Sequence, residues 1–337
     1  YHQGYDFFRR EVSDAGIAVH EVAVREVGSI ATIRSLRRVI TGGRFDVVLA
    51  YMDTPGIYGE IACAGINRVA LVVSERVDLD DSAGWRQNVR IGLHRLADRV
   101  VANSAYCAEQ LRERFPWISP RLEVIRNGVD VDLYGSLACG QYPLSERSDD
   151  VKLVAVGTVT PRKNALAVVK ALHILKSSGS AVPFVTWVGK VDNDPSSRSY
   201  RESVDREIVA SGLGTHWTWA GEVADVALML RGAHALLHPS HREGVSNAIC
   251  EALAAGLPVL ASDRGDNRWL VGCNERGMLF DPSEPHSIAQ VISDFLRLDC
   301  SQRRNLGLQA GIFARQELAL EQFVSNYERL FRTLVGS

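Results

Sequence analysis

Two glutamates and two neighbouring cations are the residues of this sequence best placed for chemistry. Glu243 lies in a polar loop, and Glu251 follows it eight positions later in a run of good helix formers. Arg162 and Lys163 are adjacent, and they stand in a loop that comes directly before another helical run. Carboxylates that accept hydrogen bonds from hydroxyl groups, together with cations that neutralise phosphate, suit a ligand that carries both groups, such as a nucleotide sugar.

The stretch 235–262 predicts the elements that would position the two glutamates. The apolar run 235–238 predicts a strand, 248–255 predicts a helix, and 259–261 predicts a second buried strand. A unit this short forms a right-handed parallel crossover, and ligands of such sheets lie beyond the carboxyl ends of the strands. We therefore expect a ligand at the loop 240–247.

The first turn of the predicted helix is a second reason to expect an anion there. Its unpaired N–H groups, near Val245 to Asn247, lie at the positive end of the helix dipole and favour a phosphate. Simpler readings remain open for each of these residues. Glu251 could be a helix-surface residue and Asn247 a helix cap, while Arg162 and Lys163 could be solvated loop cations.

The order of residues around the two glutamates resembles the signature of the family 4 retaining glycosyltransferases. The shared pattern is H-P-S-x-x-E-G-x-x-N-x-x-x-E-A-x-A-x-G-x-P-V. Its matching residues are His238, Pro239, Ser240, Glu243, Gly244, Asn247, Glu251, Ala252, Ala254, Gly256, Pro258 and Val259. The resemblance implies an α/β protein of the GT-B fold, in which two doubly wound Rossmann-like domains face each other across a cleft.

The resemblance also implies a donor site. Glu251 would accept hydrogen bonds from ribose hydroxyls, and Glu243 would lie near the transferred sugar. Backbone N–H groups in the loop and the first turn of the helix would hold phosphate or sugar. The expected donor-binding residues are Gly157, Thr158, Arg162, Lys163, Glu243, Gly244, Val245, Ser246, Asn247 and Glu251.

Two positions depart from the family pattern. The family has a Lys at the position of Lys163, and it usually has an Arg where this chain has Thr158. We expect Arg162 to substitute for that Arg. Many members also carry a His after the strand that corresponds to residues 69–73. Here Ser74-Glu75-Arg76 follows, as in some bacterial members that build surface polysaccharides or lipid-linked glycans. Glu75 could face the donor sugar or the acceptor, or it could be half of a salt bridge with Arg76 or a neighbour.

The activity implied by the resemblance is retaining, metal-independent hexosyl transfer. A UDP- or GDP-sugar would be the donor, a saccharide or lipid-linked molecule the acceptor, and no cofactor is expected. The expected catalytic residues are Glu243, Lys163, Arg162 and Glu75, and the leaving phosphate would take the acceptor proton in a front-face attack. Two alternatives stay open: a GT-B nucleotide-sugar epimerase, and a non-catalytic nucleotide-binding GT-B module.

Strands alternate with helices along the whole chain, which predicts parallel sheets. We expect an N-terminal acceptor domain at residues 1–140, a nucleotide-sugar domain at 141–312, and a C-terminal helix at 313–337 that packs back towards the first domain. The predicted strands lie at 45–50, 69–73, 99–102, 122–125, 151–156, 184–188, 236–238, 259–261 and 277–280, with a linker at 136–150. The sequence opens on a predicted helix (7–15) and strand (19–24). Members of the family it resembles usually begin with one more strand and a glycine-rich loop before such a helix, so the resemblance implies that both are missing here.

Composition places the chain among ordinary globular proteins. Its 337 residues are 46% hydrophobic and 23% charged, and the net charge of -2 gives no reason to expect nucleic acid. No apolar run reaches the ~18 residues of a membrane span. The six cysteines are scattered without a C-x-x-C pair, which favours a reduced compartment. We expect a cytoplasmic protein, with the inner face of the membrane as one place where it could act.

Three further features have simpler explanations. Asp192-Asn193-Asp194 resembles a metal-binding D-x-D, but a surface loop is the preferred interpretation. The histidines at 234, 238 and 241 surround one strand, with no second cluster that would complete a metal site. The arginines at 34, 37 and 38 form a basic helix edge that could touch anionic lipid headgroups, although a solvated face is preferred.

Overall fold

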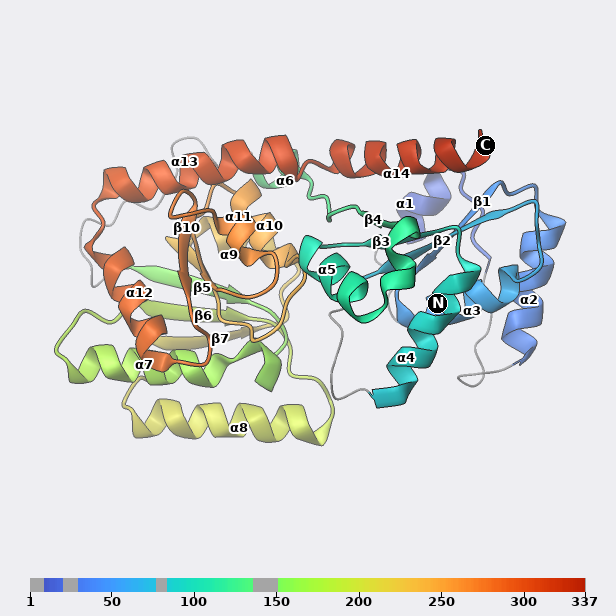
Figure 1. Ribbon diagram of the computed structural model, residues 1–337. Helices are drawn as coiled ribbons and strands as arrows, with labels where there is room; N and C mark the ends of the chain where they lie inside the picture. Colours follow the sequence, from blue (N-terminus) through green and yellow to red (C-terminus); the bar gives the residue numbers. More distant parts are fainter. Residues whose placement is uncertain (1–8, 21–29, 77–83, 136–150, 337) are drawn as a thin grey trace. The chain divides into compact units, whose positions relative to one another are not determined.

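The computed structural model describes residues 9–20, 30–76, 84–135 and 151–336 of the chain. The chain divides into two compact units, each with a parallel sheet and covering helices (Figure 1). The first unit comprises residues 1–102, 110–123 and 329–337, and the second comprises residues 103–109 and 124–328. The predicted linker 136–150, with the expected boundary near residue 140, lies outside the described residues.

The first unit is built on a four-stranded sheet in the order β1-β2-β3-β4. Its strands are β1 (Val47–Tyr51), β2 (Ala70–Glu75), β3 (Arg99–Ala102) and β4 (Leu122–Val124). The first three run parallel, since Val48 pairs with Leu71 and Val73 pairs with Val100. All four strands lie within two residues of the predicted apolar runs. Strands buried on both faces read as continuous apolar runs, which is why they are visible in the sequence.

The helices before and between these strands alternate with them along the chain, as in parallel sheets, and residues 105–109 of the last of them belong to the second unit. They are α1 (Arg9–Asp14), α2 (Ile30–Gly42), α3 (Asp53–Cys63), α4 (Gly84–Leu93) and α5 (Ala105–Arg114), with short 3-10 helices η2 (His94–Leu96) and η3 (Pro116–Arg121). The predicted strand 19–24 lies mostly outside the described residues. Arg37, from the basic edge of α2, donates hydrogen bonds to the carbonyls of Ala62 (2.9 Å) and Ala64 (2.7 Å). This arginine therefore helps to cap the end of α3.

The second unit contains a six-stranded parallel sheet in the order β10-β9-β8-β5-β6-β7. Its strands are β5 (Lys152–Val156), β6 (Phe184–Val188), β7 (Trp217–Gly221), β8 (Ala235–His238), β9 (Val259–Ser262) and β10 (Gly277–Phe280). Five of these strands match the predictions, whereas β7 was not predicted. It is an edge strand of sequence W-T-W-A-G, most of which is at least partly exposed, so it lacks a continuous apolar run.

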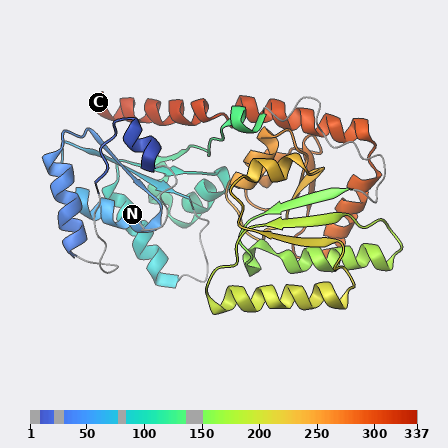
Figure 2. The ribbon, with the colours of Figure 1, turned by 180° about the vertical axis from the view of Figure 1, so that it is seen from behind.

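Two layers of helices cover this sheet, one on each face (Figures 1 and 2). Alternate residues of β5 point to opposite layers: Leu153 and Ala155 join one buried cluster, and Val154 joins the other. The first cluster includes α7 (Ala165–Ser177), α8 (Pro195–Ala210) and α12 (Pro285–Arg297). The second includes α9 (Val226–Arg231), α10 (Asn247–Ala254), α11 (Asn267–Val271) and α13 (Cys300–Glu317).

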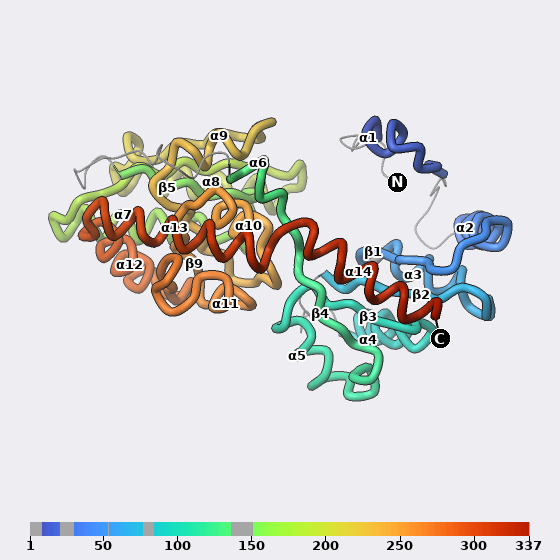
Figure 3. The backbone as a smooth tube through the Cα atoms, turned by 90° about the horizontal axis from the view of Figure 1, so that it is seen from above, coloured from blue at the N-terminus to red at the C-terminus, as the bar shows by residue number. Residues whose placement is uncertain are grey.

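Helix α10 is held in place by a close approach to α13, beside which it lies in Figure 3. A Cβ atom added to Gly307 of α13 would lie 2.3 Å from the carbonyl oxygen of Gly256, just after α10, so only glycine fits there. The short helix α6 (Val131–Gly135) also packs on α10, and α14 (Leu320–Val335) follows α13 as the predicted C-terminal helix. Among the described residues, no helix is both long enough and apolar enough to cross a membrane.

Candidate functional site

The strand order of the second unit reverses between β5 and β8. The chain leaves β5 towards β6 and β7 on one side, then returns to build β8, β9 and β10 on the other side. Ligands of open parallel sheets bind at such a switch point, outside the carboxyl ends of the two strands. The loops that leave those ends are residues 157–164 after β5 and residues 239–246 after β8. They are the two loops that carry the expected cations and glutamate.

Hydrogen bonds join the two loops into one structure. The backbone N–H of His241 donates to the carbonyl oxygen of Arg162 at 2.9 Å, and the Ser240 hydroxyl donates to the same oxygen at 3.2 Å. Asn164, with a left-handed φ of 63°, donates from its side chain to the Pro239 carbonyl at 3.2 Å. These hydrogen bonds fix the two loops relative to each other, and with them the side chains that the loops carry.

An ion pair lies at the centre of this site. Lys163 Nζ is 2.6 Å from Glu243 Oε1, and Arg162 donates to the same oxygen at 3.4 Å. His238 Nε2 also lies 3.3 Å from Oε1, at an angle outside hydrogen-bond geometry. The side chains of Glu243 and Lys163 are only 10% and 14% exposed, whereas that of Arg162 is 52% exposed. The solvated-cation reading is therefore wrong for Lys163, and Arg162 remains half in solvent.

This environment keeps Glu243 charged. Burial opposes its ionisation, but the contacts with His238 and Lys163 outweigh burial and hold the pKa of the carboxyl well below its usual range. Burial lowers the pKa of His238, so that its imidazole is neutral near pH 7. The site thus offers a charged carboxylate and a charged ammonium side by side.

Two glycines that the sequence analysis missed shape the backbone of the site. Gly189 follows β6, and a Cβ atom there would lie 2.0 Å from the carbonyl oxygen of Gly157. Gly265 has a φ of 55°, and its Cβ atom would lie 1.8 Å from the carbonyl oxygen of Glu243. The Gly157 carbonyl also accepts a 2.8 Å hydrogen bond from the indole of Trp187. Both loops therefore rest on backbone that approaches too closely for any side chain.

Helix α10 begins at the site. Its N-cap residue is Ser246, which makes no side-chain capping bond, so the Ser246 hydroxyl does not satisfy an N–H group of the first turn. Asn247 is already helical, and its side-chain oxygen accepts a 2.6 Å hydrogen bond from Asn127. The alternative that Asn247 is the cap is therefore wrong. Because the side chains of Val245 and Ser246 are buried, these residues offer a ligand their backbone groups.

Glu251 lies about one turn into α10. It is half-buried, and burial raises its pKa to about 7. It forms no ion pair with another residue that the structure describes. Burial and the nearby Glu251 raise the pKa of Tyr134, on α6, to about 12. Glu251 is thus more enclosed than a helix-surface residue, and a half-buried carboxylate without donors is stabilised by a ligand that supplies them.

The remaining donor-site candidates lie in the same two loops. Thr158 follows Gly157, and the next residue, Val159, donates its N–H to the Lys190 carbonyl at 2.9 Å. The carbonyl of Gly244 accepts the N–H of Asp266 at 3.3 Å. All ten expected donor residues therefore belong to the second unit, at or near the switch point.

Glu75 lies in the first unit, at the carboxyl end of β2. It contacts Arg90 and His94, whose Nε2 is 3.2 Å from Oε1 of Glu75. Arg76 instead donates to the hydroxyl of Tyr51. Of the open alternatives, a salt bridge with Arg76 is therefore wrong, because successive residues of an extended chain point to opposite faces. A salt bridge with another residue is present, since Arg90 pairs with Glu75.

Asp194 and His234, which the sequence analysis did not assign to a metal site, have structural roles in the folded chain. Asp194 caps α8 by accepting the N–H of Ser197 at 2.9 Å. His234 Nδ1 accepts the N–H of Lys152 at 3.0 Å, beside the start of β5. Among the described residues, no group of three His, Cys, Asp or Glu side chains could hold a metal ion.

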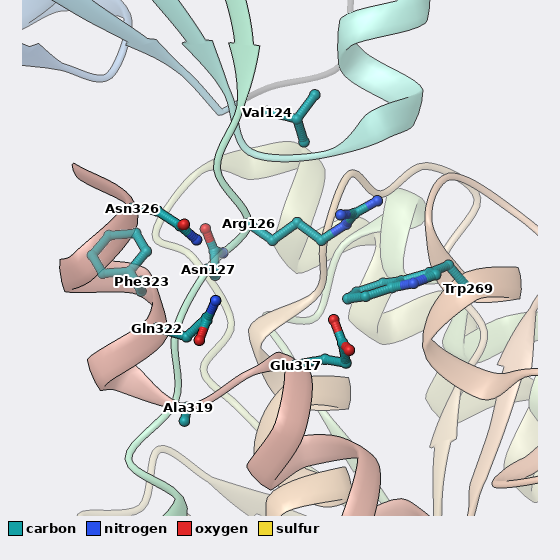
Figure 4. Close-up of a pocket in the computed structure, with 9 residues that line it drawn as sticks. All are labelled: Val124, Arg126, Asn127, Trp269, Glu317, Ala319, Gln322, Phe323 and Asn326. Atoms are coloured by element: carbon teal, nitrogen blue, oxygen red, sulfur yellow. The ribbon is translucent and has the colours of Figure 1, made fainter. Parts of the chain in front are cut away.

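A separate small pocket of the second unit appears in Figure 4, where Arg126 lies against the ring of Trp269. The guanidinium carbon is 4.0 Å from the ring centroid, and Arg126 Nε is 3.3 Å from Asp266. Asp266 also accepts the N–H groups of Ala105 (2.9 Å) and Tyr106 (2.8 Å). Because Asp266 bonds to Gly244 as well, this pocket is connected to the loop of the ion pair. The sequence analysis missed these residues, whose contacts span more than a hundred positions.

Comparison with known proteins identifies the class. The structure of Anabaena Alr3699/HepE in complex with UDP-glucose superposes with a TM-score of 0.80 at 20% identity, covering 97% of this chain and 89% of that chain. The two parallel-sheet units therefore have the GT-B fold.

Sequence comparison then gives the family. The model of "Glycosyl transferases group 1" matches residues 143–311, and that of "Glycosyltransferase Family 4" matches residues 4–133. The chain belongs to this family of glycosyltransferases, as the sequence motif predicted.

Two curated relatives come from actinobacteria. A GDP-mannose-dependent alpha-mannosyltransferase of Mycobacterium tuberculosis is 27% identical over 323 residues, which covers 88% of this chain and 79% of the relative. A D-inositol 3-phosphate glycosyltransferase of Thermomonospora curvata is 29% identical over 226 residues, or 64% of this chain. The alignment spans 52%, about half, of that second relative.

Proposed function

We propose that this chain is a retaining hexosyltransferase that moves a hexose from a UDP- or GDP-sugar to a hydroxyl group of a saccharide or lipid-linked acceptor. The observation that carries the proposal is the Lys163–Glu243 pair beside the start of α10, where no side chain caps the helix. A cation, a carboxylate and free helix N–H groups meet at one switch point. A nucleoside-diphosphate sugar presents an anion and hydroxyl groups to all three.

In the proposed reaction, the bond between the anomeric carbon and the diphosphate oxygen breaks. An acceptor oxygen bonds to the same face of that carbon, and the acceptor proton passes to the departing phosphate oxygen. The products are a nucleoside diphosphate and a glycoside of unchanged anomeric configuration. Positive charge develops on the sugar ring and negative charge on the diphosphate. Lys163, Arg162 and the N–H groups of α10 would stabilise the departing diphosphate, and this scheme requires no metal ion.

Glu243 has one carboxylate oxygen to offer the sugar. Its contacts with Lys163, Arg162 and His238 all fall on Oε1. We assign Oε2 to the hydroxyl groups of the transferred hexose. Because its pKa is well below the usual range, the carboxylate stays charged and accepts hydrogen bonds throughout the neutral range. Lys163 would then link the sugar-binding carboxylate to the phosphate.

Glu251 would bind the ribose. A carboxylate that is half-buried without donors among the described residues gains two hydrogen bonds when ribose hydroxyls reach it. These bonds favour the charged form, so the nucleotide should lower the pKa of Glu251 from about 7. This role accounts for a carboxylate in a helix that is otherwise apolar.

The donor and the compartment are also part of the proposal. The name of the mycobacterial relative includes GDP-mannose, and the Anabaena protein was solved with UDP-glucose, so both nucleotides are candidates. All five cysteines that the structure describes are free, which fits a reducing cytoplasm. A lipid-linked acceptor would be met at the inner face of the membrane.

A thermal-shift panel of UDP, GDP, ADP and their hexose conjugates, without added metal, tests the donor site. A ligand near a hundred times its dissociation constant should add about 2.7 kcal/mol, visible as a shift of several degrees. No shift with any nucleotide would overturn the proposal.

Replacing Glu243 by Ala then separates the activities. Transfer should fall at least about a hundredfold while nucleotide binding largely survives. Glu202→Ala, on the exposed face of α8, is the matched control. An isomerised nucleotide sugar formed without acceptor would identify an epimerase, and binding without turnover would identify a non-catalytic module.

A further inference from the structure

A buried cluster of charged residues lies in the first unit, which contains none of the expected donor-binding residues. It contains Glu60 of α3, Glu75 at the end of β2, Arg90 of α4 and His94 at the start of η2. Glu60, Glu75 and His94 are each at most 1% exposed. Nothing in the proposed donor chemistry uses this cluster, apart from the candidate role of Glu75.

His94 lies between the two glutamates. Its Nδ1 is 2.6 Å from Glu60 Oε1, and its Nε2 is 3.2 Å from Glu75 Oε1. Arg90 donates to the same oxygen of Glu75. Since both ring nitrogens face carboxylates, the ring bonds to both only when it carries two protons. The cluster then holds two negative and two positive charges.

Protonation of His94 agrees with this charge balance. Burial alone would lower the pKa of His94, but its hydrogen bonds to Glu60 and Glu75 outweigh burial and raise the pKa to about 9. Burial likewise opposes ionisation of Glu75, yet His94 and Arg90 hold the pKa of that carboxyl below its ordinary value. Near neutral pH His94 is therefore protonated and Glu75 is ionised.

One carboxylate oxygen of each glutamate has no hydrogen bond to another described residue. Oε2 of Glu60 and Oε2 of Glu75 are buried, and neither has a hydrogen-bond partner in the described part of the chain. An unpartnered buried carboxylate oxygen is unfavourable by about 1–3 kcal/mol or more. Glu60 lies within α3, whereas Glu75 ends a parallel strand, where ligands of such sheets bind.

A purely structural role explains this cluster poorly. Apolar side chains of similar volume commonly stabilise a core as well as a buried ion cluster does, or better. Sequences depart from apolar packing chiefly at functional sites. The neighbouring strand β1 also ends on polar side chains, since Tyr51 accepts a hydrogen bond from Arg76 there. The carboxyl edge of this sheet is thus polar at two adjacent strands.

We propose that Oε2 of Glu75 accepts a hydrogen bond from a hydroxyl of the acceptor saccharide, and that His94, with Glu60 behind it, is the positioning residue that holds this carboxylate. The inference rests on the proposed transferase function, because it concerns the second substrate of that reaction. Arg90 and His94 both contact Oε1, which restricts rotation of the carboxylate and leaves Oε2 as the oxygen without a partner among the described residues. Glu75 contacts substrate in this scheme, whereas His94 acts through Glu75.

The test uses the full chain and separates donor from acceptor. Nucleotide binding is measured by thermal shift with UDP and GDP. Transfer is measured as nucleoside diphosphate release from UDP- and GDP-hexoses, with a panel of octyl hexopyranosides as acceptor probes. The variants are Glu75→Gln and His94→Gln. His234→Gln is the control, because it replaces a histidine of similar burial that bonds to the backbone in the second unit.

We expect Glu75→Gln to lower kcat/KM for the glycoside about ten- to a hundredfold, the loss of one hydrogen bond to a charged group. The nucleotide shift should be unchanged. His94→Gln should give a similar loss, and it should also change the pH profile. In the parent chain, transfer should decline as pH rises through about 9 and His94 loses its proton, whereas the variant should lack that decline. Tyr51, the nearby phenol, has a pKa raised by burial and stays neutral in this range.

The outcomes are distinguishable from failure of the transferase proposal. Absence of any nucleotide shift in the parent chain would overturn the donor site itself. Nucleotide binding without glycoside-dependent release in the parent chain would overturn the assignment of a saccharide hydroxyl to Glu75. Equal transfer by parent and Glu75→Gln would do the same. A His94→Gln variant that loses transfer but keeps the alkaline decline would show that His94 is only structural.

Discussion

Lys163 Nζ and Glu243 Oε1 lie 2.6 Å apart although 80 residues separate them in the chain. The pair joins the loop after β5 to the loop after β8, and both side chains are largely buried. A buried ion pair is weak evidence for stability, because desolvation offsets much of its attraction. Its position at the switch point of the sheet, beside a helix start, is what makes it informative about function.

Replacing Lys163 should affect both catalysis and stability. Lys163→Ala removes the main cation beside the proposed diphosphate, so kcat should fall about a hundred- to a thousandfold, as when one preorganised donor is lost. It also leaves Glu243 without its nearest cation. Glu243→Gln should therefore recover part of the lost stability in the double variant, as a double-mutant cycle by thermal unfolding would show. Lys170→Ala, exposed on α7, is the control. Independent, additive effects of the two substitutions would contradict the assigned pairing.

Nucleotide binding should release a proton near neutral pH. Glu251 has a pKa raised by burial to about 7, so it is partly protonated at pH 6.5, and ribose hydroxyls should favour its charged form. Isothermal titration calorimetry at pH 6.5, in buffers of different ionisation enthalpy, measures the released proton. Glu251→Gln should bind the nucleotide more weakly and release none. A proton release that persists in this variant would place its source elsewhere.

The same carboxyl should make folding less favourable as pH rises. In the unfolded chain Glu251 ionises near its ordinary pKa, whereas in the folded chain it ionises near 7. The folded state binds more protons between these values, so the free energy of unfolding should fall over that range and level off above pH 7. Urea titrations of the nucleotide-free chain and Glu251→Gln, compared at pH 5 and 7.5, measure this contribution. The parent chain should lose more stability than the variant.

His94 should give a pH dependence of the same sign as Glu251, at higher pH. Its pKa is raised to about 9 in the folded chain, above the ordinary value of 6.5 that applies when unfolded. Its contribution is therefore fully present below pH 6.5 and is lost as pH rises through about 9. Imidazole ¹⁵N shifts of histidine-labelled protein should show His94 as an imidazolium at pH 8. That signal should vanish in His94→Gln, and its survival would assign it to another histidine.

Gly265 should tolerate no side chain. A Cβ atom would lie 1.8 Å from the Glu243 carbonyl oxygen, and the φ of 55° disfavours other residues. Gly265→Ala should destabilise the chain by about 1–3 kcal/mol and weaken nucleotide binding, because the loop of Glu243 must move. Gly214→Ala is a matched control, since a Cβ atom there meets nothing within 4 Å. Unchanged nucleotide affinity in Gly265→Ala would show that this backbone contact is dispensable.

Sequence reasoning located the buried strands because parallel strands covered on both faces read as apolar runs. Strand β7 was missed because an edge strand needs no such run, and Trp217–Gly221 mixes aromatic, polar and small residues. The motif also brought Glu243 and Lys163 to the same site. The motif could not show which residues far away in the sequence contact this site. Gly189 and Gly265 matter only through the carbonyl that each approaches, and that carbonyl is known only once the chain is folded.

Glu75 is a second residue whose contacts could not be predicted from the sequence. Adjacency in sequence suggested Arg76 as its partner, yet Glu75 contacts His94 and Arg90, which follow it by 19 and 15 positions. Adjacent side chains of an extended chain point to opposite faces, so they do not contact each other. The partners of Glu75 come instead from the helical segment that follows the strand. Glu60 and His94 carry no motif of their own, and only their common contact marks them as a group.

The order in which the second sheet is assembled has a consequence during synthesis. Strands β5, β6 and β7 can pair as soon as residue 221 has emerged, but β8 must then insert beside β5, the first strand made. Until residue 243 is available, the growing chain has half a sheet, an edge of β5 without β8, and a lysine without its glutamate. Long-range pairing of this kind is slow and leaves such edges open to wrong partners. A nucleotide could therefore assist only the last steps of folding, and a chain released before β8 would be prone to aggregate through β5.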